Sequence, residues 1–236
     1  MYHRARAGRH GNPTEILDAH FAHIAAHYAV VSPGEPLSSE RLNVCLTFDD
    51  GYFDFYARVF PLLEKHHLRA VLAIPPAVIH DAVDATNEDR LALDSEAAFA
   101  EPRRGGFCTW PELKSLAGSG RVTLAAHGMT HVRLDGPDDN LTLEVESPGV
   151  LLKTRTGSEV DSFVFPFGRF SSPSLETARA HYTHVFRIGG ALNRGWGARV
   201  IYRVDADAMT SRDALFEPAK LLRYRARYFW NQLRRR

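Results

Sequence analysis

The sequence predicts an α/β protein folded as an incomplete (β/α)7-type barrel. Short runs of β-branched and other apolar residues alternate with longer segments of helical periodicity, which is the pattern of a parallel sheet wrapped by helices. The chain has 236 residues and 44% hydrophobic content, enough for one large domain with a buried core. An open doubly wound sheet would show nearly the same alternation, so the strand count favours the barrel without excluding that architecture.

The N-terminal half is expected to alternate strands and helices. Residues 1–2 are interpreted as the end of a strand, and after a polar loop Thr14 is the expected N-cap of the first helix. The next elements are the strands YAVVS and Leu42–Phe48, the helix Phe55–His67 and the strand RAVLAIPP. Residues 80–107 are acidic, rich in alanine and irregular, and we interpret them as an insertion or a mobile loop.

The C-terminal half continues this alternation. TWPELKSLAGSG is expected to be a helix with Thr109 as N-cap and Pro111 in its first turn, and RVTLAAHG is a strand that runs into a loop. The remaining elements are a polar helix or helix pair in DNLTLEVESPGVLLKTRTG, the strand SFVFPFG, the helix SSPSLETARAHY, and the strands THVFRIGG and RVIYRVD. We expect one domain over residues 1–215 and a C-terminal helix over residues 216–236.

Charge and composition exclude several classes of protein. A formal charge of +1 and a pI near 7.9 give no electrostatic reason to expect a nucleic-acid partner. The two distant cysteines, Cys45 and Cys108, indicate neither a disulfide framework nor a thiolate zinc site. No segment approaches the roughly 18 uninterrupted apolar residues of a membrane span, and the N-terminus lacks the apolar core of a secretory signal. We therefore expect a cytoplasmic protein.

Two adjacent carboxylates, Asp49 and Asp50, end the strand in LTFDDGY. Neighbouring side chains of a strand point to opposite faces, but Gly51 permits a sharp turn that lets both reach the C-terminal end of the barrel. Barrel enzymes build their active sites at that end. Because two carboxylates this close raise each other's pKa unless a cation lies beside them, the pair indicates a metal ion.

Candidate ligands for that metal are His127 and His131 in AAHGMTH, which follow a strand. Two imidazoles and a carboxylate suit zinc or another divalent transition metal and leave positions for water and substrate. The chain has twelve histidines, so two ordinary loop histidines are the alternative. In FVFPFG, Pro166 and Gly168 end a strand in a way that can free a backbone N–H to stabilise an oxyanion. An ordinary buried strand end is the alternative there.

Taken together and in this order, TFDDG, HxxxH and a strand ending in P-F-G resemble the NodB-type polysaccharide deacetylases of carbohydrate esterase family 4. The resemblance covers the chain from its first residues to about Asp205. FVFPFG resembles the third motif of the branch that includes the poly-N-acetylglucosamine deacetylases, and the arginine usual in this motif is absent. The resemblance implies the NodB homology domain, a divalent metal with zinc as first choice, and an acetylated amino-sugar glycan as substrate.

The same resemblance implies a role for each matching position. Asp49 corresponds to the general base, and the backbone N–H of Phe167, after Pro166, would lie in the oxyanion hole. The implied metal ligands are Asp50, His127 and His131.

The general acid follows a permuted layout. Most members of the family carry it in a late L-x-H motif, which is absent after Tyr202, whereas the branch named above has a Y-H pair near the N-terminus. MYHRA resembles that element, so His3 is the candidate acid. A solvated histidine near a frayed terminus is the alternative, with His10, His181 and His184 as fallback acids.

Three further residues are candidates for binding or positioning. Arg203 in IYRVD resembles a late element of the same branch, and we expect it to order Asp49 through a charge-assisted hydrogen bond. Tyr52 and Trp110 carry rings suited to lining a sugar groove. A plain strand-end arginine and packed aromatic rings are the alternatives.

The C-terminal segment KLLRYRARYFWNQLRRR interleaves arginines with aromatic residues. Its residues Leu222, Ala226, Phe229 and Leu233 fall on one helical stripe. One prediction is peripheral contact with an anionic membrane surface, which basic amphipathic helices with aromatic residues make. The other is a helix docked on the barrel with a solvated basic face.

The sequence therefore predicts a metal-dependent hydrolase that removes N-acetyl groups from an amino-sugar polysaccharide or glycoconjugate and releases acetate. An O-acetyl polysaccharide esterase is an alternative, because the motifs do not distinguish an amide from an ester. A non-catalytic glycan-binding module with the same barrel is another, motivated by the missing arginine of the third motif and the terminal position of His3. Neither the glycan, the metal nor the oligomeric state follows from the sequence.

Overall fold

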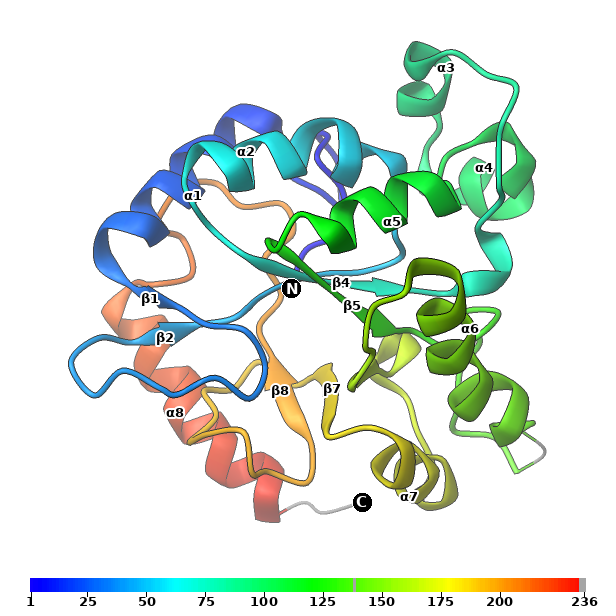
Figure 1. Cartoon of the computed structure of the whole chain (residues 1–236). Helices are drawn as coiled ribbons and strands as arrows, with labels where there is room; N and C mark the ends of the chain where they lie inside the picture. Colours follow the sequence, from blue (N-terminus) through cyan, green and yellow to red (C-terminus); the bar gives the residue numbers. More distant parts are fainter. Residues whose placement is uncertain (138, 234–236) are drawn as a thin grey trace.

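The computed structural model describes residues 1–137 and 139–233, and its centre is a curled six-stranded parallel sheet with helices around it (Figure 1). The strands are ordered β3-β4-β5-β6-β7-β8, and every neighbouring pair is parallel. They are β3 Leu46–Phe48, β4 Ala70–Ile74, β5 Val122–Ala126, β6 Ser162–Val164, β7 His184–Ile188 and β8 Ile201–Arg203. The predicted incomplete barrel is confirmed.

The first residues of the chain close the gap between the two edge strands. On one side Tyr2 donates its N–H to the carbonyl oxygen of Thr47 in β3, at 2.9 Å. On the other side the amino group of Met1 donates to the carbonyl oxygen of Val204, just after β8, at 2.6 Å. The N-terminal segment thus lies where a seventh strand would stand, and it brings His3 to the ends of β3 and β8.

The helices cover the outer face of the sheet (Figure 1). They are α1 Thr14–His27, α2 Phe60–Lys65, α3 Asn87–Ala92, α4 Ser95–Ala100, α5 Trp110–Gly118, α6 Ser147–Thr156, α7 Ser172–His181 and α8 Pro218–Leu233. The predicted cap of α5 is confirmed, because Thr109 and Glu112 form a reciprocal capping box. The predicted Thr14 cap is wrong: Pro13 occupies the N-cap position of α1, and no side chain caps that helix.

Two predicted helices are divided by prolines. A π-helical turn, η1 Phe55–Val59, precedes α2, and a second, η4 Thr142–Glu146, precedes α6. Pro61 and Pro148 lie in the first turns of the α-helices that follow. A proline has no N–H to donate to the α-helical ladder of hydrogen bonds. The turn before each proline therefore forms the wider hydrogen-bonded loop of a π-helix.

Two further predictions need correction. YAVVS contributes β1 Ala29–Val30, which pairs with β2 Asn43–Val44 in a separate two-stranded ribbon and not with the barrel sheet. Cys45 separates β2 from β3, so the predicted strand Leu42–Phe48 is two strands.

Residues 80–107, predicted to be irregular, contain α3 and α4, whose N-caps are Thr86 and Asp94. The buried Arg90 of α3 pairs with Glu112 of α5, which attaches this segment to the barrel helices.

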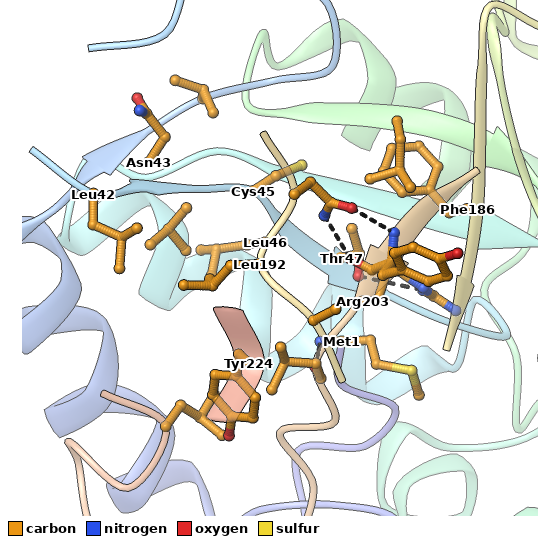
Figure 2. Close-up of a pocket in the computed structure, with 18 of the residues that line it drawn as sticks. Met1, Leu42, Asn43, Cys45, Leu46, Thr47, Phe186, Leu192, Arg203 and Tyr224 are labelled. Atoms are coloured by element: carbon orange, nitrogen blue, oxygen red, sulfur yellow. Dashed lines mark hydrogen bonds between the residues drawn. The ribbon is translucent and has the colours of Figure 1, made fainter. Parts of the chain in front are cut away.

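The strands separate two apolar cores. On β4 Ala70, Leu72 and Ile74 face the helices, whereas Val71 and Ala73 face the barrel interior. The interior core consists of Val71, Ala73, Ala125, Val164, Phe186 and Ile201. A cavity of about 190 Å³ lies at the gap between β3 and β8. Figure 2 shows Tyr224 of α8 among the residues that line it. Among the described residues, no helix combines the length and apolar character needed to cross a bilayer.

Candidate metal centre and active site

The Asp49–Asp50 turn follows β3 at the C-terminal edge of the sheet. Asp50 and Gly51 both have left-handed backbone, with φ of 74° and 70°. Glycine adopts this conformation freely, and aspartate tolerates it better than most residues. The turn therefore begins at Asp50, one residue before the glycine on which the prediction relied. Asp49 and Asp50 are 3% and 4% exposed, so two carboxylates are buried side by side.

Asp50, His127 and His131 face one another at this edge. Nε2 of His131 lies 3.2 Å from Oδ1 of Asp50, and Nε2 of His127 lies 3.5 Å from the same oxygen. The candidate ligand atoms of the three residues all lie within 4.8 Å of one another. Among the described residues, Oδ1 of Asp50 is buried without a hydrogen-bond partner, which is costly unless a cation compensates it. The three side chains fit a divalent metal ion such as zinc.

The ring orientation and ionisation of these residues also suit a metal. Nδ1 of His127 lies 2.8 Å from the carbonyl oxygen of Val164 in β6, so Nδ1 donates to that carbonyl and Nε2 is turned towards Asp50. Burial raises the pKa of Asp50, but interaction with His127 and His131 outweighs it and holds the pKa well below its usual range. Asp50 is therefore ionised, as a metal ligand must be.

The loop that carries the two histidines is held by Glu144, a residue that sequence reasoning missed. Its buried carboxylate accepts the backbone N–H groups of Met129 and Thr130, at 2.9 and 3.0 Å, and the Thr130 hydroxyl at 2.6 Å. A Cβ on Gly128, whose φ is 70°, would lie 3.3 Å from the same carboxylate. The sequence carried no distinct signal for this role, because Glu144 lies in a segment rich in polar residues.

Asp49 is bound by Arg203 at the end of β8. Nη1 and Nη2 of Arg203 donate to the two carboxylate oxygens at 2.6 and 2.7 Å, and both residues are buried. Figure 2 shows Arg203 beside Thr47, whose hydroxyl lies 3.3 Å from Nη1. Burial raises the pKa of Asp49, but the charge and the hydrogen bonds of Arg203 outweigh it and lower the pKa below its usual range. Asp49 is therefore ionised and fixed in orientation.

His3 lies next to Asp49 and is held by Asp207. Its Nε2 is 3.9 Å from Oδ2 of Asp49, and its Nδ1 is 2.5 Å from Oδ2 of Asp207. The backbone N–H of His3 donates to the other Asp207 oxygen at 3.1 Å, so the residue is anchored and not frayed. Burial lowers the pKa of His3, but the Asp207 hydrogen bond and the charges of Asp49 and Asp50 exceed that effect and raise the pKa to about 9.

The fallback histidines lie in other surroundings. His10 packs edge-on against His3, with ring centroids 6.0 Å apart. His3, His10 and Asp207 also have candidate ligand atoms within 4.8 Å, but two ligands of a tetrahedral zinc lie about 3.3 Å apart, and the 2.5 Å contact is a hydrogen bond. His181 lies beside Glu146, and His184 starts β7, at the edge of the sheet opposite the carboxylate turn.

The third motif forms a short turn, η5 Pro166–Gly168, in which Phe167 has a φ of 56°. The Phe167 ring is 56% exposed and lies against the ring of His131, with centroids 4.7 Å apart. The turn therefore borders the candidate metal site. The role of the Phe167 N–H in an oxyanion hole stays a prediction.

The two predicted sugar-lining aromatics are buried. The Tyr52 ring is 2% exposed and stacks on Phe107 at 5.1 Å, and the Arg4 guanidinium lies 4.2 Å from the ring centroid. Trp110 is 7% exposed, with the guanidinium of Arg155 over its ring. Both rings are packed inside the protein, and a role for either in lining a sugar groove stays a prediction. Phe167 is the exposed aromatic side chain beside the candidate metal site.

The family model for "Polysaccharide deacetylase" matches residues 38–185 of this chain. A curated relative, the poly-beta-1,6-N-acetyl-D-glucosamine N-deacetylase of Escherichia coli strain K12, is 36% identical over 94 residues. That match covers 40% of this chain and only 12% of the relative's length.

Two solved structures share the fold. A de-N-acetylase from Aggregatibacter actinomycetemcomitans superimposes with a TM-score of 0.69 at 20% identity, covering 89% of this chain and 94% of the other. IcaB from Ammonifex degensii also gives a TM-score of 0.69, at 19% identity, covering 88% and 90% of the two chains. At this identity the likeness concerns the fold alone.

Proposed function

The chain belongs to the polysaccharide deacetylase family, and from that premise we propose that it is a metal-dependent hydrolase that removes N-acetyl groups from an amino-sugar glycan and releases acetate. The observation that carries the proposal is the meeting of the Asp49–Asp50 turn, the His127–His131 pair and His3 at one edge of the sheet. The matched relative whose name specifies β-1,6-linked N-acetylglucosamine supports an amino-sugar substrate of that type.

The domain that performs this reaction extends beyond residues 38–185. His3 and Arg203 lie outside that matched range, yet they contact Asp49 from opposite ends of the chain. We therefore assign the deacetylase domain to residues 1–215, with 80–107 as an insertion in it.

Asp50, His127 and His131 would hold the metal, with zinc as our first choice for their donor set. A divalent ion bound there supplies Lewis-acid chemistry, activating water and polarising an amide carbonyl. Glu144 fixes the backbone of the histidine loop, and Val164 fixes the tautomer of His127, so the ligands are oriented in advance.

Asp49 is the general base in this proposal. Its pKa lies below the usual range because of Arg203, so the carboxylate is ionised at neutral pH and can accept a proton from the attacking water. Arg203 donates one hydrogen bond to each carboxylate oxygen of Asp49. Oδ2 of Asp49 also faces His3 and His127, at 3.9 and 4.0 Å. The base therefore points towards the space between the acid and the metal ligands.

His3 is the general acid. With a pKa of about 9 it carries a proton at neutral pH, and Asp207 holds Nδ1 so that Nε2 faces the site. From Nε2 the proton would pass to the departing amine as the carbon–nitrogen bond breaks. The backbone N–H of Phe167, held by the turn after Pro166, would stabilise the negative charge on the carbonyl oxygen.

Acetate release from oligomers of N-acetylglucosamine tests the proposal. Incubation with β-1,6- and β-1,4-linked oligomers, before and after chelation and zinc repletion, should give acetate only with metal present. An O-acetylated polysaccharide in parallel distinguishes the esterase alternative. Metal binding without acetate from any substrate would contradict the proposal and favour a glycan-binding module.

A further inference from the structure

The C-terminal helix α8 has two faces on opposite sides of its axis. Tyr224 is buried, and Leu221 and Tyr228 are half-buried against the barrel. Leu221 and Tyr224 also wall the cavity between β3 and β8, where Figure 2 shows Tyr224. At about 100° per residue these positions cluster on one side of the helix. The helix is therefore docked on the barrel through this face.

The opposite face carries an exposed apolar stripe, defined by Leu222, Ala226, Phe229, Trp230 and Leu233. Leu222 is 68% exposed, Phe229 and Trp230 are each 53% exposed, and Leu233 is 82% exposed. These residues follow helical spacing, so their side chains form a continuous strip along the outside of α8. Scattered exposed apolar residues need no explanation, but an aligned strip with two large aromatics indicates a contact surface.

Arginines flank the exposed stripe on both sides. Arg225 lies on one flank, and Arg223 and Arg227 lie on the other, by the angular spacing of an α-helix. Arg194 adds a further cation, with its guanidinium 4.8 Å from the Phe229 ring centroid. The sequence from residue 218 to residue 236 contains no aspartate or glutamate. The exposed side of α8 therefore carries arginines and no carboxylate of its own, which suits an anionic partner.

The end of α8 lies beside the edge of the sheet that carries the candidate active site. The Asn231 side chain donates to the carbonyl oxygen of Gly189 at 3.0 Å. Gly189 follows β7 directly. Its neighbour Ile188 packs closely on Gly168 of the third motif, since a Cβ atom added to Gly168 would lie 3.2 Å from Ile188. A surface bound by the outer face of α8 would thus lie close to the opening used by a substrate.

We propose that α8 binds an anionic phospholipid bilayer, with the exposed stripe inserted at the interface and the flanking arginines on lipid phosphates. Exposed leucine, phenylalanine and tryptophan between arginines, without any acidic residue, are the chemistry that interfacial helices use. A protein partner would be expected to present acidic groups to the same arginines, and the test below separates the two. The proposal is independent of the deacetylase activity.

Vesicle flotation with the full chain tests this proposal. Binding is expected with vesicles of phosphatidylglycerol and phosphatidylcholine, and not with phosphatidylcholine alone. Raising the salt from about 0.1 to 0.5 M should weaken it, because screening reduces the attraction of the arginines. Trp230 emission should shift to shorter wavelength and be quenched by lipids brominated on their acyl chains. Equal binding to neutral and anionic vesicles, or none to either, would overturn the proposal.

Matched variants locate the contact. Phe229→Glu and Leu222→Glu should each weaken binding at least about tenfold, since each removes inserted apolar area. Val150→Glu is the control, because Val150 is 67% exposed on α6, away from the stripe. If the control weakened binding equally, α8 would not be the contact. If the wild type were a concentration-dependent oligomer without lipid and Phe229→Glu made it monomeric, the stripe would be a protein interface and the proposal wrong.

Discussion

Asp49 and Asp54, two aspartates close in the sequence, each pair with a buried arginine, but the two arginines contact the carboxylates differently. Arg203 binds both oxygens of Asp49, at 2.6 and 2.7 Å. Arg4 donates from Nε to one oxygen of Asp54, at 2.7 Å, and its Nη2 donates to the carbonyl oxygen of Leu93. The other Asp54 oxygen is buried without a partner among the described residues.

The two carboxylates consequently differ in ionisation. Burial raises the pKa of both. For Asp49 the charge and hydrogen bonds of Arg203, together with the charges of His127 and His3, outweigh burial and lower the pKa, whereas for Asp54 burial exceeds the effect of Arg4 and the pKa is raised. Burial and the presence of an arginine therefore do not mark a reactive carboxylate by themselves. Asp54 binds Arg4 and the N–H of Ala5, which anchors the N-terminal segment, whereas Asp49 is kept ionised at the open edge of the sheet.

Replacing each of the two aspartates by asparagine should give the largest difference between them. Asp49→Asn should lower kcat by a factor on the order of 10³, because the amide cannot accept the proton of the attacking water. Asp54→Asn is the matched control and should keep kcat in the wild-type range while lowering the free energy of unfolding by about 3–5 kcal/mol, since Arg4 loses its charge partner. Acetate release and denaturant unfolding measure the two effects. Equal losses of kcat would show that Asp49 is structural.

Changing the arginines should separate the two pairs by pH dependence. In Arg203→Lys the bidentate contact is lost, and kcat/KM should fall about 10- to 100-fold. The pKa of Asp49 should rise towards its usual range, so activity is lost at higher pH on the acid side than in the wild type. Arg4→Lys should destabilise the fold without moving the acid limb of the pH–rate profile. A shift in both variants would remove the distinction.

Weakening the contacts of Glu144 with the histidine loop should have an intermediate effect. Glu144→Gln keeps the shape of the side chain but loses one charged acceptor, so the loop that carries His127 and His131 is held less firmly. Zinc affinity should fall about tenfold, as for other residues that orient metal ligands. Competition with a chromophoric chelator measures it. Glu146→Gln, two residues along the same turn and partly exposed, should leave zinc affinity unchanged.

Among these variants, Asp207→Asn should change turnover the least. Its effect on the pKa of His3 should be directly visible by spectroscopy. The pKa of His3, about 9, should fall because the amide no longer stabilises the imidazolium. Because this pKa is raised above the unfolded value of 6.5, its contribution to stability is complete below about pH 6.5 and lost as the pH rises through 9. The variant should lack that loss. Proton NMR of the His3 ring measures the pKa, and an unchanged value would contradict the assignment.

The sequence was sufficient to predict those features that depend on residues close together in the chain. A strand followed by Asp49, Asp50 and a glycine, and a strand followed by two histidines, place their side chains at one edge of any parallel sheet, so the meeting of these side chains could be predicted. The alternation of strands and helices predicted a parallel sheet wrapped by helices, and the strand count favoured the incomplete barrel over an open doubly wound sheet. The prolines at 61 and 148 were visible too, but the π-helical turns they produce depend on packing around them.

The residues that sequence reasoning missed act across long separations. Asp207 reaches His3 from 204 positions away, and Arg4 reaches Asp54 across 50. Glu144 binds the histidine loop from 14 and 15 positions along the chain, and its burial on η4 is not visible in the local sequence pattern. Nothing in the local pattern around Tyr52 predicts that Phe107 and Arg4 cover its ring, so its burial required the three-dimensional structure.

Zinc content and turnover, measured together in Asp49→Asn and Asp50→Asn, decide whether Asp50 holds the metal while Asp49 acts as base. Asp49→Asn should retain close to the wild-type zinc content and lose acetate release, whereas Asp50→Asn should lose both. Loss of zinc in Asp49→Asn, or retention of both properties in Asp50→Asn, would contradict this division of roles.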